Sequence, residues 1–143
     1  MKLLDVNLWL AASWARHSGH AAAKRWFDAE SDGLALCRVT QMALLRLVTN
    51  PAVTGADVLS RRRAWDLVET VMADPRVLFL AEPGGLEPLW MAFSKRDDAS
   101  HLLWTDDYLA AFAQASGAEL VTLDRGLRRR YPSVQVTCLA SVE

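Results

Sequence analysis

The chain has 143 residues, of which 52% are hydrophobic and 23% are charged, and its formal net charge is −1. This composition is that of an ordinary globular protein and excludes disordered, collagen-like and coiled-coil classes. The near-neutral charge gives no bulk attraction to nucleic acid, so any basic surface must be local.

Short apolar runs alternate with helical patterns along the whole chain. Apolar residues three and four positions apart indicate helices, and short apolar runs between turn residues indicate strands. Asn7, Thr40 and Thr105 are suited to begin helices as N-caps. In chain order we expect a strand over residues 2–5, helices over 7–16 and 20–30, a strand over 34–39, helices from 41 and over 56–73, a strand over 77–80, a helix ending near 95, a helix over 106–116, a strand over 119–123, a short basic helix, and a last strand over 134–138.

The apolar strand runs are nearly continuous, which is typical of strands that are buried on both faces. Such strands alternating with helices predict an α/β fold with a central parallel sheet flanked by helices. The length suits one hydrophobic core, and no linker or internal repeat divides the sequence. We therefore expect a single domain over residues 1–143.

The residues that bear on compartment favour a soluble, cytoplasmic protein. The apolar start of the chain is interrupted by Asp5 and Asn7, which does not suit a secretory signal. No uninterrupted apolar run approaches the roughly 20 residues that span a bilayer. Cys37 and Cys138 lie far apart in the sequence and form no Cys-x-x-Cys motif, so we expect two free thiols in a reducing compartment.

Two of the expected strands are followed by an aspartate, Asp5 at the start of the chain and Asp124 near its end. The carboxyl ends of parallel strands lie along one edge of a sheet, where ligands usually bind. We therefore expect both carboxylates on the same edge, although 119 positions separate them. The alternative is that each aspartate only caps the helix that follows it.

A third acid, Asp106, lies in the first turn of the helix that Thr105 is expected to cap. Asp106 shares a helical face with the apolar stripe that follows it, whereas Asp107 points in a less apolar direction. Compensation of the helix dipole would explain acids at this position without any site. An acid on the inner face near two strand-end acids would instead suffer repulsion, which a hard cation such as Mg²⁺ or Mn²⁺ relieves.

A divalent cation held by carboxylates suits hydrolysis of phosphodiesters, because it lowers the pKa of a bound water and stabilises charge on the phosphate. The sequence contains none of the motifs of nucleotide-binding loops or zinc peptidases that would indicate another chemistry. The three histidines are scattered and are expected to be surface or packing residues, since a zinc site needs closer grouping.

Four segments together resemble the PIN-domain ribonucleases of the VapC toxin type, and they cover nearly the whole chain. The segments are MKLLDVNLWLA, HAAAKRWF, TQMALLRLVTNP and LLWTDDYLAAFAQASGAELVTLDRGL. The first and last are the specific ones. The resemblance implies a parallel sheet between helices and an endoribonuclease, a hydrolase in which a metal-activated water attacks an RNA phosphodiester. It also implies the toxin role of a type II toxin–antitoxin pair, with a VapB-type antitoxin and a homodimer as expected partners.

The resemblance also assigns roles to individual residues. Asp5, Asp106 and Asp124 match the catalytic and metal-binding acids, with Mg²⁺ or Mn²⁺ as the implied cofactor. Asn7 and Thr122 match polar neighbours that support these acids, and Arg46 matches an arginine expected at the RNA. Where the family usually has a glutamate, this chain has Gln41. Glutamine keeps an oxygen for the metal or its water but leaves the site about one negative charge short.

Basic residues cluster in the triplet 61–63 and directly after Asp124, where Arg130 ends the second cluster. We expect Arg125, Arg128 and Arg129 to bind RNA phosphates beside the acids, with an affinity that falls as salt rises. A solvated face is the alternative for both clusters, and the triplet favours it because three consecutive helical residues cannot share a face. Among the six tryptophans, Trp26 and Trp65 are expected in the core, Trp9, Trp14 and Trp90 are candidates for an exposed interface, and Trp104 favours neither.

Two other functions are compatible with parts of the sequence. Gln41 would fit a PIN-like module that binds RNA or protein but cleaves weakly, although the three retained aspartates argue against it. A receiver-type signalling domain would need a pair of acids after the first strand and a lysine after a late strand. Asp5 stands alone at the first of these places, and both interior lysines fall on helical patterns, so we disfavour this class.

Overall fold

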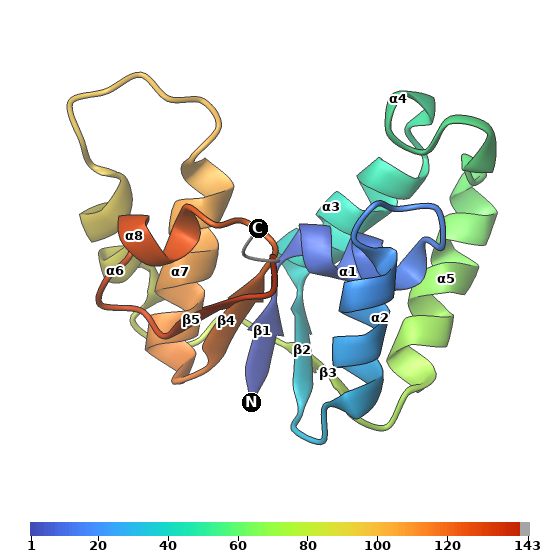
Figure 1. The fold of residues 1–143 in the computed structure, drawn as a ribbon. Coiled ribbons are helices and arrows are strands. Elements are labelled where there is room, and N and C mark those ends of the chain that lie inside the picture. The colour runs from blue at the N-terminus through green and yellow to red at the C-terminus, as the bar shows by residue number, and fades with distance from the viewer. Residues whose placement is uncertain (141–143) are drawn as a thin grey trace.

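The computed structural model describes residues 1–140, which form one parallel sheet with helices on both sides (Figure 1). The sheet order is β3-β2-β1-β4-β5. The strands are β1 (Lys2–Leu4), β2 (Leu34–Cys37), β3 (Val77–Leu80), β4 (Glu119–Thr122) and β5 (Val136–Cys138). The helices are α1 (Val6–Ser13), α2 (His20–Ala29), α3 (Arg38–Val48), α4 (Pro51–Thr54), the 3₁₀ turn η1 (Gly55–Asp57), α5 (Arg61–Ala73), α6 (Leu86–Ser94), α7 (Trp104–Ser116) and α8 (Leu127–Arg130). The predicted α/β fold with a parallel sheet between helices is confirmed.

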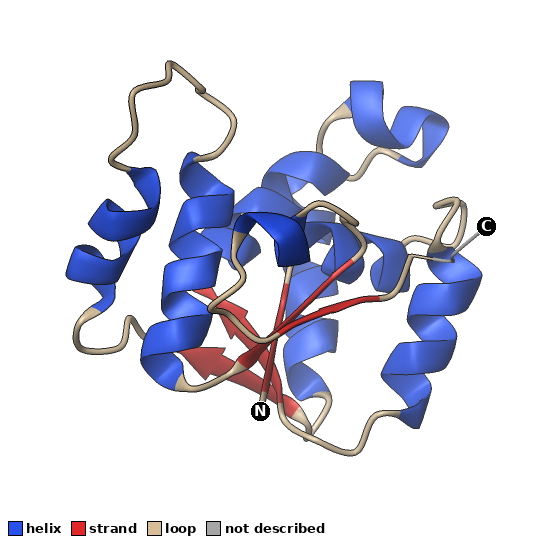
Figure 2. Cartoon of the chain, turned by 60° about the vertical axis from the view of Figure 1, so that its left-hand side comes forward, coloured by secondary structure: helices blue, strands red, loops and turns tan. Residues whose placement is uncertain are grey.

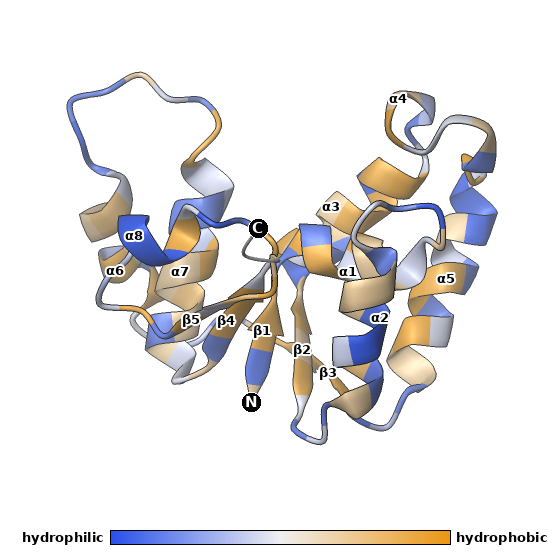
Figure 3. Ribbon diagram, viewed as in Figure 1, coloured by the Kyte–Doolittle hydropathy of each residue, from blue (hydrophilic) through white to orange (hydrophobic). Residues whose placement is uncertain are grey.

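Alternation along the strands divides the core into two clusters, one on each face of the sheet. Leu3 of β1 packs with α7, whereas the next residue, Leu4, packs with α1 and α3. Leu120 and Val121 of β4 alternate in the same way. This follows from the two-residue period of a strand, and Figure 2 shows helices on both faces. The apolar strands contrast with the hydrophilic α8 (Figure 3).

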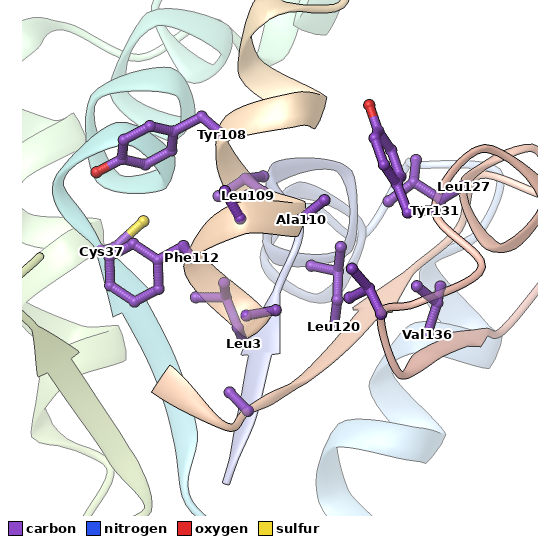
Figure 4. Close-up of a cluster of buried hydrophobic side chains, with 14 of the residues drawn as sticks. Leu3, Cys37, Tyr108, Leu109, Ala110, Phe112, Leu120, Leu127, Tyr131 and Val136 are labelled. Atoms are coloured by element: carbon purple, nitrogen blue, oxygen red, sulfur yellow. The ribbon is translucent and has the colours of Figure 1, made fainter. Parts of the chain in front are cut away.

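The first cluster fixes α7, the helix that carries Asp106 and Asp107, against the sheet. Phe112 and Leu109 of α7 are fully buried against Leu3 and Leu120 (Figure 4). Burying side chains of this size contributes roughly 1.5–3 kcal/mol each. Leu127 and Tyr131 at the two ends of α8 belong to the same cluster, so α8 has a fixed position beside α7.

The second cluster corrects two expectations about tryptophans. Trp9 is only 1% exposed and meets Phe27 edge-on, because α1 packs against α2 as well as against the sheet. Trp65 is 49% exposed, since α5 buries Ala64 and Val68 and turns Trp65 outward. The prediction of an exposed Trp9 and a buried Trp65 is therefore wrong for both residues.

Several expected helix starts lie elsewhere in the structure. Asp5, and not Asn7, caps α1, because its carboxylate accepts a hydrogen bond from the amide of Val6 at 2.7 Å. The helix expected from residue 41 begins at Arg38, and Thr40 lies inside its first turn. Leu103 is the N-cap residue of α7, which begins at Trp104 and thus one residue before the expected cap. The expected helix over 56–73 is split into η1 and α5, since the Ser60 hydroxyl caps a new start.

The structure bears on two of the sequence features discussed above, the absence of a long apolar run and the two cysteines. Within residues 1–140, no helix is long and apolar enough to cross a membrane. Both cysteines are free, and Cys37 is buried in the first cluster.

Candidate active site

The carboxyl ends of β1 and β4 bring Asp5 and Asp124 together. The two strands pair in parallel, and the Asp5 amide donates to the carbonyl of Val121 at 2.9 Å. Thr122 links the two acids directly. Its hydroxyl donates to Asp5 Oδ2 at 2.8 Å and accepts from the Asp124 amide at 3.0 Å. Thr122 therefore lies at the expected supporting position between two acids from opposite ends of the chain.

Arg130 connects the third acid to this pair. Asp106 lies in the first turn of α7, and Arg130 is the last residue of α8. The Arg130 Nη2 donates to Asp106 Oδ2 at 2.9 Å and to Asp124 Oδ2 at 3.0 Å. One guanidinium nitrogen thus bridges two carboxylates, and the structure gathers all three predicted acids at one edge of the sheet.

The electrostatics of the cluster make an added cation favourable. Asp5 is 4% exposed, and burial raises its pKa although the Thr122 hydroxyl and the Val6 amide oppose this shift. Burial also raises the pKa of Asp106 to about 6, followed by repulsion from Asp5, while Arg130 lowers it. Carboxylates whose pKa values are raised by burial, and further by one another's charge, gain from a positive charge placed between them.

The neighbouring acid, Asp107, has a different role from the one its helical face suggested. It is 8% exposed, and its carboxylate accepts a hydrogen bond from the Tyr131 hydroxyl. The expectation of a less apolar direction is wrong, because α8 and Tyr131 cover this side of α7. Asp107 is therefore a structural acid that joins α7 to the end of α8.

Gln41 is buried, whereas Asn7 is exposed. Gln41 is buried in the first turns of α3, and its Oε1 accepts a hydrogen bond from Arg38. The Arg38 guanidinium in turn lies 4.7 Å from the centre of the Phe79 ring. Asn7 is exposed in the first turn of α1, two residues after Asp5. Their predicted support of a metal or its water stays a prediction.

The predicted RNA-binding arginines fall into two places. Arg125, Arg128 and Arg129 are exposed in and just before α8, the helix that follows Asp124. Arg128 donates to the Val136 carbonyl at 3.0 and 3.2 Å and so ties α8 to β5. Arg46 lies in the last turn of α3, where it lines a cavity with Trp65 between α3 and α5.

The carboxylate oxygens of the site suit a hard cation, although the acidic side chains do not surround a common binding position as they stand. Carboxylate oxygens are the ligands that Mg²⁺ and Mn²⁺ prefer in proteins. As the side chains stand in residues 1–140, no three His, Cys, Asp or Glu residues form a metal-binding group. The Arg130 guanidinium holds the positive charge between Asp106 and Asp124, so a metal would have to replace it there.

The sequence placed Arg130 in the basic cluster expected at RNA phosphates, but it did not predict that Arg130 pairs with the acids. The local signal is Gly126, because a Cβ atom at this position would lie 3.2 Å from Asp124 Oδ1 and 3.1 Å from Arg130 Nη1. A larger residue here would make both side-chain ends give by a few tenths of an ångström. The Gly126 amide also donates to Asp124 Oδ1 at 2.7 Å, so the glycine lies directly against the carboxylate that Arg130 contacts.

The chain is similar to known proteins over most of its length. The PIN domain family model matches residues 2–131. The ribonuclease VapC41 of Mycobacterium tuberculosis is 40% identical, with 98% of this chain and 99% of the relative aligned. Ribonuclease VapC38 of the same species is 33% identical over 89% of this chain and 87% of its own length.

Solved structures share the fold at low sequence identity. The M. tuberculosis VapC20 toxin, described as cleaving the sarcin–ricin loop, has a TM-score of 0.68 at 15% identity, covering 90% of this chain and 94% of its own. VapBC2 of Rickettsia felis, bound to a DNA fragment from its promoter, has a TM-score of 0.68 at 13% identity, covering 96% and 97%. These structures share the fold, while the PIN domain match over residues 2–131 and the 40% identity to ribonuclease VapC41 show that the chain belongs to the PIN-domain family, among the VapC ribonucleases.

Proposed function

We propose that this protein is a metal-dependent endoribonuclease that acts as the toxin of a VapBC-type toxin–antitoxin pair. The observation that carries the proposal is the meeting of Asp5, Asp106 and Asp124 at one edge of the sheet. The ribonuclease relatives that align over nearly the whole chain support the same activity.

Asp5, Asp106 and Asp124 are the residues that would hold Mg²⁺ or Mn²⁺. The bound ion would lower the pKa of a water and stabilise negative charge on the phosphodiester. Thr122 holds the Asp5 carboxylate in place through its 2.8 Å hydrogen bond. Arg125 and Arg129 are exposed and follow Asp124 closely in the sequence, which supports a role for them in binding RNA phosphates.

The proposed partners are an RNA, a VapB-type antitoxin and a second copy of the chain, in the cytoplasm. Toxin–antitoxin complexes are among the solved structures with this fold, including one from Klebsiella pneumoniae with a TM-score of 0.66 and 18% identity, covering 99% of this chain and 100% of its own. These neighbours support an antitoxin as partner.

A second candidate function is a PIN-like module that binds RNA or protein and has lost most cleavage. Two observations favour it: Gln41 replaces the usual acid, and Arg130 occupies the cation position between Asp106 and Asp124. Both reduce the negative charge available to a metal. Measuring RNA binding and RNA cleavage on the same protein separates the two functions.

The test is cleavage of a labelled single-stranded RNA by the purified protein with Mg²⁺ or Mn²⁺, and again with EDTA. We expect cleavage with the metals, none with EDTA, and none for Asp106→Asn or Asp124→Asn. Asp66→Asn is the matched control, because Asp66 is an exposed acid on α5. RNA binding without cleavage at any metal concentration would favour the binding module instead.

A further inference from the structure

We propose that a cavity beside the acids binds one unpaired nucleotide of the RNA strand, adjacent to the phosphodiester that is cleaved. This inference rests on the proposed ribonuclease function and assigns a substrate subsite to it. The cavity measures about 480 Å³ and lies between the 95–103 loop, the start of α7 and the end of α8. The loop extends beyond α6 and α7 in Figure 1.

Arg130 forms a common wall of the cavity and the acid cluster. Its side chain lines the cavity, while its Nη2 bonds Asp106 and Asp124 at 2.9 and 3.0 Å. Asp107, which also lines the cavity, is the next residue after Asp106. An RNA strand whose phosphate lies at the three acids therefore has this cavity as the neighbouring space.

Trp104 gives the cavity an aromatic surface that suits a nucleobase. The residue is 55% exposed although it lies directly before the turn that carries Asp106. It is also held in place, because Trp90 meets its ring edge-on at 6.4 Å and donates to its carbonyl oxygen at 3.2 Å. Unpaired bases stack on fixed aromatic side chains of this kind, with little dependence on sequence.

Arg96 is the guanidinium of the cavity that can meet a phosphate of the strand. It is exposed, and its Nε donates to the Phe93 carbonyl at 2.9 Å. Arg130 would become available to a phosphate only when a metal replaces it between Asp106 and Asp124. Asp98 accepts from the Ser100 amide at 3.0 Å and Asp107 accepts from Tyr131, so both carboxylates are held in place but keep their charge. Arg96 and the aromatic surface of Trp104 are therefore the features that favour a nucleotide.

The test measures binding of a labelled single-stranded RNA to proteins that all carry Asp5→Asn, so that cleavage does not interfere. We expect Trp104→Leu to weaken binding by about tenfold and Trp104→Phe to retain most of the affinity. Trp65→Leu is the matched control, because Trp65 is 49% exposed on α5, and it should bind as the parent does.

A set of RNAs, each with one abasic nucleotide at a different position, locates the base that the cavity takes. The parent protein should lose affinity for one abasic position, and Trp104→Leu should be insensitive at that same position. Equal losses in both proteins, or unchanged binding of Trp104→Leu, would overturn the subsite while leaving RNA cleavage by the natural chain intact. A natural chain that neither binds nor cleaves RNA would overturn the ribonuclease function as well.

Discussion

Replacing Asp106 by asparagine should stabilise the metal-free protein at neutral pH. Burial and the charge of Asp5 raise the pKa of Asp106 from 3.8 to about 6 in the folded state. The pKa of Asp106 is higher in the folded protein than in the unfolded chain, so protonation of Asp106 stabilises the folded state. This stabilisation is complete at a pH below the unfolded pKa. That contribution is lost as the pH rises through about 6.

The size of the effect follows from the pKa difference. Each unit corresponds to about 1.4 kcal/mol, so a shift of about two units sets an upper limit of about 3 kcal/mol. The Asp106 side chain is 26% exposed, and solvent screening reduces the expected value to about 1–2 kcal/mol. The loss of the Arg130 ion pair is already included, because Arg130 lowers the same pKa.

Urea denaturation in EDTA, repeated from about pH 4 to about pH 8, measures this difference in the free energy of unfolding. We expect Asp106→Asn to gain stability over the natural chain as the pH rises, with no gain at the acidic end. Asp107→Asn is the control, because it weakens the Tyr131 hydrogen bond and should destabilise the protein across the range. Parallel curves for Asp106→Asn and the natural chain would refute the like-charge argument.

Three further predictions concern charge at the site. Arg130→Gln should tighten Mn²⁺ binding by about tenfold in calorimetry, because two partly exposed ion pairs worth about 0.5–1 kcal/mol each no longer compete; weaker binding would contradict this. Gln41→Glu adds a carboxylate and should lower the metal concentration at half-maximal cleavage by about tenfold or less, since Arg38 would neutralise part of the added charge. Identical metal titrations for the variant and the natural chain would mean that Gln41 is too far from the metal to affect it. Arg129→Ala should reduce the slope of log RNA affinity against log salt concentration by about one unit. Arg128→Ala should in addition lower the stability of the protein, because it loses two hydrogen bonds to β5. An unchanged slope for Arg129→Ala would mean that Arg129 is only a solvated surface residue.

The fold and the three acids were predictable because each depends on short local patterns. An apolar run followed by aspartate marks a strand end, and parallel pairing then places Asp5 and Asp124 on one edge without further information. The helical period places Asp106 toward Asp124, but it does not reveal that Asp107 is buried as well. These features need only the chain direction and the period of the element.

The errors and the missed residue depend on tertiary contacts that no local pattern contains. Trp9 is buried because α2 covers α1, and Asp107 is buried because Tyr131 returns to it from α8. Arg130 reaches Asp106 from 24 positions away, from the end of α8. In each case the partner comes from an element whose position the sequence alone does not specify.

The most direct test of the central claim measures metal binding and RNA cleavage on the same protein. Mn²⁺ binding is followed by electron paramagnetic resonance while cleavage of a single-stranded RNA is titrated with the same ion. The account predicts that the two midpoints coincide and that Asp124→Asn loses both binding and cleavage. Undiminished cleavage in EDTA, or full cleavage by Asp124→Asn, would contradict a metal-dependent site built on Asp5, Asp106 and Asp124.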